Sequence, residues 1–222
     1  AKEYGSYQAI DGGNAHVALY RMIGGYPIAY YMNQMETKTM VQNGELWKRM
    51  LKWYNEGNFM CAGSNPGSDT QRNLQGIVLG HAYTVLRVVE VQGNKLIQLR
   101  NPWGNTEWKG DWSDDSKKWT PKIRNALHYD DPNDDGIFWM CFKDFCNNYF
   151  SIYACIQPQT KYHYEMNGSW KPGEKDGAKP YSKSNDATNL PQWLIRCKKT
   201  RQKGLPQLLC FLEKNGGRSV CW

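Results

Sequence analysis

Two short motifs hold the side chains best suited to chemistry. The first is Leu-Gly-His-Ala-Tyr at 79–83, and the second is Arg-Asn-Pro-Trp-Gly at 100–104. In Cys–His–Asn catalysis the imidazole takes the proton of a thiol, while the oxygen of the Asn side chain fixes the tautomer of the imidazole. Taken singly, His81, Asn101 and Trp103 are typical of a structural histidine, a turn residue and a core aromatic. Together, on neighbouring strands, they favour the catalytic interpretation.

The elements that carry these motifs follow from hydrophobic periodicity and turn signals. The pattern predicts helices near 15–21, over 44–55 with Asn43 as its cap, and over 143–150, and strands over 76–91, 95–101, 137–141, 151–157, 192–197 and 207–213. The rest of 1–35 is expected to be loop, 64–76 an exposed polar loop, and 102–135 a loop-rich acidic segment.

His81 and Asn101 do not lie opposite each other in a regular hairpin. The Gln-Gly-Asn turn at 92–94 pairs Asn101 with Val85 instead. At ~3.3 Å per residue, the offset from His81 is too long for a hydrogen bond. We therefore expect a bulge or a wider loop within 88–94.

Composition excludes several classes of protein. The chain has 222 residues, a net charge of +7 and 40% hydrophobic residues, a content that disordered tails do not reach. No apolar run attains the roughly 20 residues of a membrane helix, so no integral membrane segment is expected. All the excess charge falls in 161–222, with 12 Lys/Arg against 5 Asp/Glu, whereas 1–160 has 16 of each. The hypothesis of a module that binds nucleic acid or a membrane surface depends on the charge of this tail alone. We expect no nucleic-acid partner.

The cysteines and the acidic segment bear on metal binding. The seven Cys form no CxxC and fit no zinc spacing, so we expect no zinc site and mostly buried, reduced thiols in a cytoplasmic protein. We also expect no nucleotide cofactor. Eight acidic residues crowd into 107–135. This cluster is either a solvated face or a site for a hard cation such as Ca²⁺, which takes about 6–8 oxygen ligands.

In their order along the chain, these motifs resemble the protease core of the calpain family. The resemblance starts with Gly-Ser-Tyr-Gln-Ala-Ile-Asp-Gly-Gly at 5–13, includes both motifs above, and continues with Asp-Asp-Gly-Ile-Phe-Trp-Met at 134–140. It implies an α+β fold for 1–157: the second lobe of a papain-like cysteine protease, a twisted antiparallel β-sheet or barrel with few short helices. A looser resemblance of the tail implies that 158–222 holds a linker and the opening strands of a C2-like β-sandwich.

The resemblance also implies roles for single residues. His81 would be the catalytic histidine, Asn101 the asparagine that orients it, and Trp103 the tryptophan that flanks and gates the cleft. The family's nucleophilic Cys lies in a first lobe, upstream of Ala1. Cys61 is an alternative nucleophile that we disfavour, because no helix start surrounds it to lower the pKa of its thiol.

A Ca²⁺ site is implied as well. Its ligands would be Glu107, Asp114, Asp135 and the backbone carbonyl of Asn133, while Ile137 stands where a carboxylate is usual. Because affinity follows the number of charged ligands, this replacement should weaken Ca²⁺ binding. In the alternative interpretation these are ordinary carboxylates of a loop.

Three hypotheses follow from these patterns. The first is part of an intracellular, calcium-dependent, calpain-type cysteine endopeptidase, which hydrolyses peptide bonds of protein substrates and needs the missing first lobe as its partner. Because the chain lacks an initiator Met, it is expected to begin inside a longer protein and to be inert alone. The second is a catalytically dead calpain-like protein that serves as a binding scaffold, and the third is the basic module of the tail. The residue at the upstream nucleophile position separates the first two: Cys favours the enzyme, and Ser or Gly the scaffold.

Overall fold

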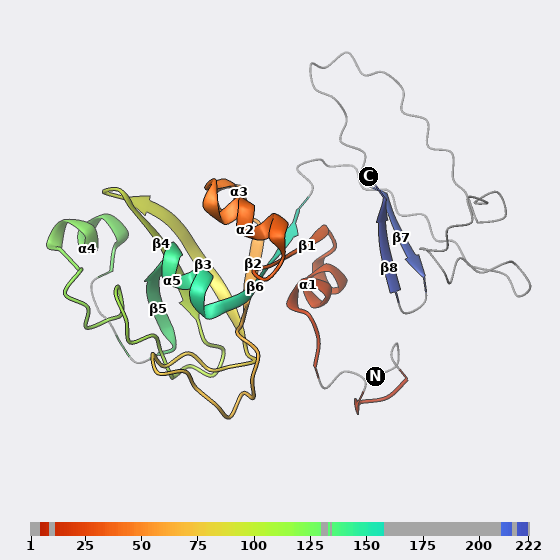
Figure 1. Ribbon diagram of the computed structural model, residues 1–222, viewed down its shortest axis with the longest axis horizontal. Coiled ribbons are helices and arrows are strands. Elements are labelled where there is room, and N and C mark those ends of the chain that lie inside the picture. Colours follow the sequence, from red (N-terminus) through yellow and green to blue (C-terminus); the bar gives the residue numbers. More distant parts are fainter. Residues whose placement is uncertain are drawn as a thin grey trace, which may run out of the picture. The chain divides into compact units, whose positions relative to one another are not determined.

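A computed structural model describes residues 5–8, 12–129, 133 and 135–157, together with the backbone of 210–214 and 217–221. The chain divides into two units, Ala1–His163 and Tyr164–Trp222. The first unit carries both motifs, and its architecture can be followed in Figure 1. Within the described residues, no helix is long and apolar enough to cross a membrane.

The first unit is built on one antiparallel sheet of six strands in the order β1-β6-β2-β3-β4-β5. The strands are β1 Tyr26–Tyr31, β2 Phe59–Ser64, β3 Ala82–Val91, β4 Asn94–Arg100, β5 Ile137–Cys141 and β6 Tyr149–Ile156. The helices are α1 Ala15–Ile23, α2 Met35–Gln42, α3 Glu45–Asn55, α4 Pro121–Leu127 and α5 Phe142–Asn148. The expected α+β class, with an antiparallel sheet and few short helices, is confirmed.

Strand β1 contradicts the prediction of loop for this part of 1–35. Its sequence, Tyr-Pro-Ile-Ala-Tyr-Tyr, follows two glycines and contains Pro27, which together indicate a loop. The strand lies at the edge of the sheet and pairs only with β6. An edge strand tolerates proline, because the missing N–H costs no ladder hydrogen bond on the open side.

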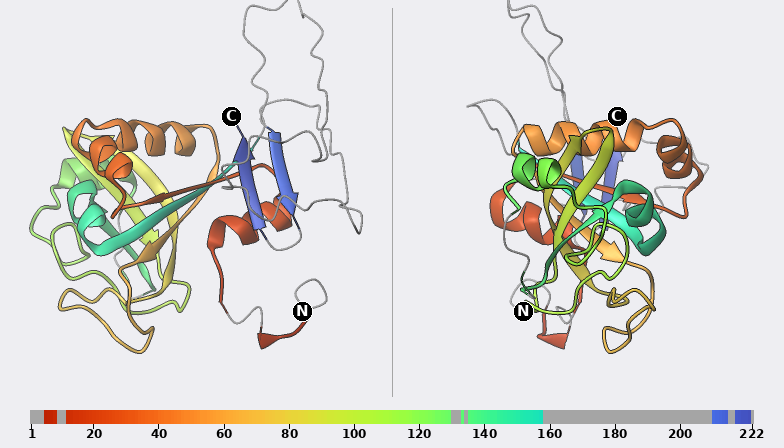
Figure 2. Two further views of the ribbon diagram at one scale, coloured as in Figure 1. Left: turned by 45° about the vertical axis from the view of Figure 1, so that its right-hand side comes forward. Right: turned by 90° about the vertical axis from the view of Figure 1, so that its left-hand side faces the viewer.

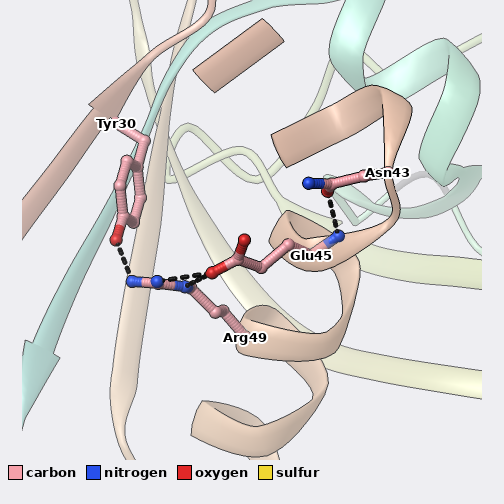
Figure 3. Close-up of polar contacts among 4 residues, drawn as sticks. All are labelled: Tyr30, Asn43, Glu45 and Arg49. Carbon is pink, nitrogen blue, oxygen red and sulfur yellow. Dashed lines mark hydrogen bonds and ion pairs between the residues drawn. The ribbon is translucent and has the colours of Figure 1, made fainter. Parts of the chain in front are cut away.

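Helix α3 covers the sheet beside β2 and β3 (Figure 2). It buries its apolar face, formed by Leu46, Trp47, Met50 and Trp53. The N-cap is Gly44, in a left-handed conformation, and not Asn43 as predicted. Asn43 lies one residue earlier, and its Oδ1 accepts from the Glu45 N–H at 2.9 Å. Arg49 then ties the helix to β1, since its guanidinium donates to the Glu45 carboxylate and to the Tyr30 hydroxyl (Figure 3).

A second, smaller core lies on the β4–β5 side of the sheet. It is mostly aromatic and consists of Leu96, Trp112, Trp119, Ile123, Leu127, Tyr129 and Trp139. Arg87 of β3 joins it, with its guanidinium 5.1 Å from the centre of the Trp139 ring and an Nη1–H that donates to the Leu127 carbonyl at 2.7 Å. This core fastens α4 and the acidic loop to the sheet.

The second unit contains one described hairpin. Strands β7 Cys210–Lys214 and β8 Gly217–Cys221 pair antiparallel. The expected strand over 207–213 overlaps β7, whereas β8 was not predicted. The expected strand over 192–197 lies outside the described residues, so the C2-like β-sandwich stays a prediction.

Candidate active site

The β3–β4 hairpin carries both motifs, and its turn is tight. Gln92 and Gly93 have φ of 48° and 76°, so both central residues are left-handed, as in a type I′ turn. Val91 pairs with Asn94 directly across this turn. The wider loop allowed for in 88–94 is therefore absent.

The expected bulge exists, but it lies nearer the site than predicted. Arg87 pairs with Gln98 and Val85 with Leu99, which leaves Leu86 as the extra residue. The I′ turn matches the twist of the strands, so the pairing stays regular beside it and the irregularity falls farther along β3. Past the bulge, this register places Asn101 opposite Tyr83.

The two motifs meet in a hydrogen bond. His81 Nε2 lies 2.9 Å from Asn101 Oδ1, and Asn101 is fully buried. The Asn101 Nδ2 donates to the carbonyls of Asn105 at 2.7 Å and Thr106 at 3.2 Å, while Oδ1 also accepts from the Trp103 N–H at 3.1 Å. If the Asn101 amide were reversed, its NH₂ group would face the Trp103 N–H, and its oxygen would face the carbonyls of Asn105 and Thr106. The hydrogen-bond partners therefore fix the orientation of the amide.

This orientation fixes the chemistry of the imidazole. Because Asn101 Oδ1 can only accept, the neutral His81 ring carries its proton on Nε2 and its lone pair on Nδ1. The Nδ1 atom is therefore the basic nitrogen of the pair. The arrangement suits a general base that takes a proton at Nδ1 while Nε2–H stays bound.

Two aromatic rings flank the imidazole. The Trp103 indole lies 4.4 Å from it, centre to centre, and is 46% exposed. The Tyr83 ring meets it edge-on at 5.2 Å and is buried. The Tyr83 hydroxyl accepts from the Val78 N–H at 2.9 Å, and burial raises the pKa of Tyr83 to about 12. Tyr83 thus ties the loop before His81 to the strand after it.

Ser64, at the end of β2, holds the backbone of His81. Its Oγ accepts from the His81 N–H at 2.9 Å and donates to the His81 carbonyl at 3.1 Å. Next to it, the Asn65 carbonyl accepts from the Gly80 N–H at 2.8 Å. Gly80 has φ of 57°, and a Cβ there would meet the Gly67 carbonyl oxygen at 2.2 Å. Sequence reasoning missed Ser64, because it lies seventeen residues from His81 and belongs to no motif.

The described thiols offer no activated nucleophile. Cys61 lies in β2 opposite Thr84, and burial, with a smaller contribution from the Cys155 thiol, raises its pKa to about 11. Burial also raises the pKa of Cys141, Cys146 and Cys155. A thiol attacks as thiolate, so a raised pKa opposes this role.

The acidic residues of the implied Ca²⁺ site have protein partners. The Glu107 carboxylate accepts from the Gly136 N–H at 2.7 Å, and Asp114 from the Tyr129 hydroxyl at 2.5 Å. Asp135 accepts from the Ile137 N–H at 2.9 Å. The backbone carbonyl of Asn133 accepts from the Asp135 N–H at 2.8 Å.

These carboxylates lie close enough to influence one another. Burial raises the pKa of Asp114, and the negative charges of Asp115 and Asp135 raise it further. Within the described part of the loop, no three His, Cys, Asp or Glu side chains are placed to hold a metal ion. Residues 130–132 and 134 lie outside that part. The described residues do not fit a formed Ca²⁺ site, and calcium binding stays a prediction.

Comparison with known proteins agrees with the motifs. The sequence model of the family described as calpain family cysteine protease matches residues 1–156. The calpain-type cysteine protease DEK1 of Arabidopsis thaliana is 39% identical over 183 residues, which cover 82% of this chain and 8% of that protein. Calpain-5 of Mus musculus is 35% identical over 197 residues, covering 80% of this chain and 30% of the relative.

A third relative is the calpain-1 catalytic subunit of Rattus norvegicus. It is 30% identical over 247 residues, covering 98% of this chain and 33% of the relative. The chain therefore spans no more than a third of the length of these three proteins. Since the family model covers most of the chain and follows the order of its motifs, the chain belongs to the calpain family of cysteine proteases.

Proposed function

We propose that this chain supplies the histidine and asparagine of a Cys–His–Asn triad in a calpain-type endopeptidase that cleaves peptide bonds of protein substrates. The observation that carries the proposal is the 2.9 Å contact from His81 Nε2 to Asn101 Oδ1, which leaves Nδ1 as the base. The nucleophilic Cys would come from a first lobe preceding Ala1 in a longer parent protein. That lobe is the partner this half of the site requires.

The first chemical step forms a thioester. His81 Nδ1 takes the proton of the thiol, and the sulfur attacks the carbonyl carbon of the scissile peptide. The resulting imidazolium returns this proton to the amine nitrogen, the C–N bond breaks, and the amine product leaves. Asn101 Oδ1 keeps its bond from Nε2–H throughout and stabilises the positive ring, as the orienting member of a triad does.

The second step hydrolyses the thioester. Nδ1 takes a proton from water, whose oxygen attacks the thioester carbon, and the C–S bond breaks as the proton passes to the sulfur. The Trp103 indole lies 4.4 Å from the His81 ring, centre to centre, and is 46% exposed, so it is suited to flank and gate the cleft. Because Asn101 is fully buried, its hydrogen bond to His81 is stronger than one in water.

Location and calcium control belong to the proposal. The cysteines among the described residues, Cys61, Cys141, Cys146 and Cys155, are all free, as in proteins of a reducing compartment. This supports the predicted intracellular, cytoplasmic location. Calcium dependence of the parent rests on the family resemblance and is to be tested by assay with Ca²⁺ and with a chelator.

The test is peptidase activity of the parent protein on an unfolded protein substrate. We expect His81→Ala to reduce kcat/KM at least about 10³-fold, as loss of a triad member does. His128→Asn is the matched control: His128 is exposed at the end of α4 with φ of 50°, a conformation that Asn tolerates. We expect the isolated 222-residue chain to be inactive.

Two results would contradict the proposal. One is peptidase activity of the isolated chain that His81→Ala abolishes, because the nucleophile would then lie within it. The other is an active parent that tolerates His81→Ala. A parent with Ser or Gly at the nucleophile position, and without activity, would favour the scaffold.

A further inference from the structure

The backbone N–H of His81 is held by the side chain of Ser64, at a place where a regular β-ladder would use a backbone carbonyl. Strands β2 and β3 pair regularly from Met60–Val85 to Gly63–Ala82. The next residues are Ser64 and His81, and the Ser64 N–H donates to the His81 carbonyl at 2.9 Å, as a ladder requires. The return bond differs: the His81 N–H donates to the Ser64 Oγ at 2.9 Å.

The reason lies on the other side of β2. There the pairing with β6 shifts between Gly63 and Ser64, so the strand leaves the regular ladder at this residue. The Ser64 hydroxyl supplies the missing acceptor and also donates to the His81 carbonyl at 3.1 Å. With Ser64 only 5% exposed, water has little access to replace it.

We propose that Ser64 is a positioning residue, whose hydroxyl fixes the His81 backbone so that the imidazole stays bound to Asn101 and presents Nδ1 to the thiol. The inference rests on the proposed function for its catalytic meaning, but its geometry can be measured separately. The His81 side chain begins at the Cα that Ser64 holds, and a shift of about 1 Å in reacting groups can cost about 100-fold in rate.

The chain offers a matched control in Ser151 of β6. Ser151 is 1% exposed and pairs with Gly63, the neighbour of Ser64. Its Oγ has no hydrogen-bond partner among the described residues. Ser151→Ala therefore makes the same chemical change in the same part of the sheet without removing a bond to His81.

The first experiment follows the Nε2 proton of His81 in the ¹⁵N-labelled 222-residue chain by NMR. We expect Ser64→Ala to speed exchange of this proton with water about tenfold or more, while Ser151→Ala leaves it within about twofold of wild type. Urea unfolding checks that each variant is folded. If Ser64→Ala fails to fold, Ser64→Cys replaces it, because a thiol fills nearly the same space but donates and accepts weakly.

The second experiment measures kinetics of the parent protein. We expect Ser64→Ala or Ser64→Cys to lower kcat about tenfold with KM within about twofold, and Ser151→Ala to change neither. Unchanged Nε2 exchange in a folded Ser64 variant would overturn the proposal, as would equal effects of Ser64→Ala and Ser151→Ala. If the wild-type parent proves inactive, the proposed function fails, whereas the exchange rates still decide whether Ser64 positions the imidazole.

Discussion

The His81–Asn101 pair and the acidic loop meet at one end of β4, yet they use their polar groups differently. The amide oxygen and nitrogen of Asn101 are both hydrogen-bonded, and one of these bonds holds His81 Nε2. The basic Nδ1 of His81 is left for chemistry. In the acidic loop, the carboxylates of Glu107 and Asp114 accept from protein donors. The pair is therefore arranged for proton transfer, whereas the described carboxylates of the loop are engaged with donors of the protein itself.

Gly136 joins the two regions. Its carbonyl accepts from the Asn101 N–H at 2.8 Å, and its N–H donates to the Glu107 carboxylate at 2.7 Å. Glycine is required here, because φ is 83° and a Cβ would lie 2.8 Å from the Asn101 carbonyl oxygen. A change in the loop would thus reach the pair through the backbone.

Among the changes that test this comparison, Asn101→Ala should have the largest effect. It leaves the His81 Nε2–H and the Trp103 N–H without their acceptor, so we expect kcat of the parent to fall about 100-fold. Asn148→Ala is the control, since Asn148 is also buried and its amide binds Asn73 and the Asp144 carbonyl. It should cost similar stability, about 1–3 kcal/mol, but leave kcat at least tenfold higher than Asn101→Ala. Equal kcat losses would reduce Asn101 to a structural role.

Next in size is Gly136→Ala, which strains the joint between the regions. We expect a loss of about 1–3 kcal/mol in the free energy of unfolding, measured by urea titration. Gly57→Ala isolates the cost of the backbone conformation alone, because Gly57 has φ of 74° with no atom within 4 Å of a Cβ. Gly136→Ala should lower the free energy of unfolding more than Gly57→Ala does, and equal losses would contradict the steric role of Gly136.

A smaller effect is expected on the pH dependence of stability, through the buried hydroxyl of Tyr83. Its pKa in the folded chain is about 12, above the ordinary 10.0, so between these values the folded state holds a proton that the unfolded state loses. This stabilisation is complete below pH 10 and is lost as pH rises through 12. We expect Tyr83→Phe to be less stable than wild type at neutral pH, with the deficit shrinking by about 1 kcal/mol at pH 11. A deficit independent of pH would contradict this.

The smallest effect concerns the loop. Ile137 stands where the family resemblance implies a carboxylate, so Ile137→Asp should strengthen Ca²⁺ binding by about threefold in Kd, measured by titration calorimetry. Glu107→Gln should weaken it in turn. If Ile137→Asp leaves calcium affinity unchanged, the implied ligand set is wrong.

The sequence predicted the local elements better than the connections between them. Helix α3 follows from its apolar spacing, although it begins one residue later than expected with Gly44 and not Asn43 as its N-cap, and the hairpin follows from alternation and the Gln-Gly turn. Strand β1 could not be predicted in this way. Pro27 is compatible with a strand at the edge of a sheet, but the sequence does not show that β1 lies at the edge. Local residue preferences do not encode neighbours in the sheet.

The site divides in the same way. His81, Asn101 and Trp103 were predicted from their motifs, and the structure brings them together. The bulge was predicted from distance, but its place at Leu86 depends on packing along both strands. Ser64 was missed, because a serine at the end of a strand carries no pattern until its partner is in place.

The most direct test is the tautomer of His81, read from two-bond ¹⁵N–¹H correlations of the imidazoles in the ¹⁵N-labelled chain above pH 8. We expect that His81 carries its proton on Nε2, with an unprotonated Nδ1, and that Asn101→Ala mixes the two tautomers. A proton on Nδ1 in the wild type would contradict it, because the nitrogen facing the thiol would then have no lone pair to accept a proton.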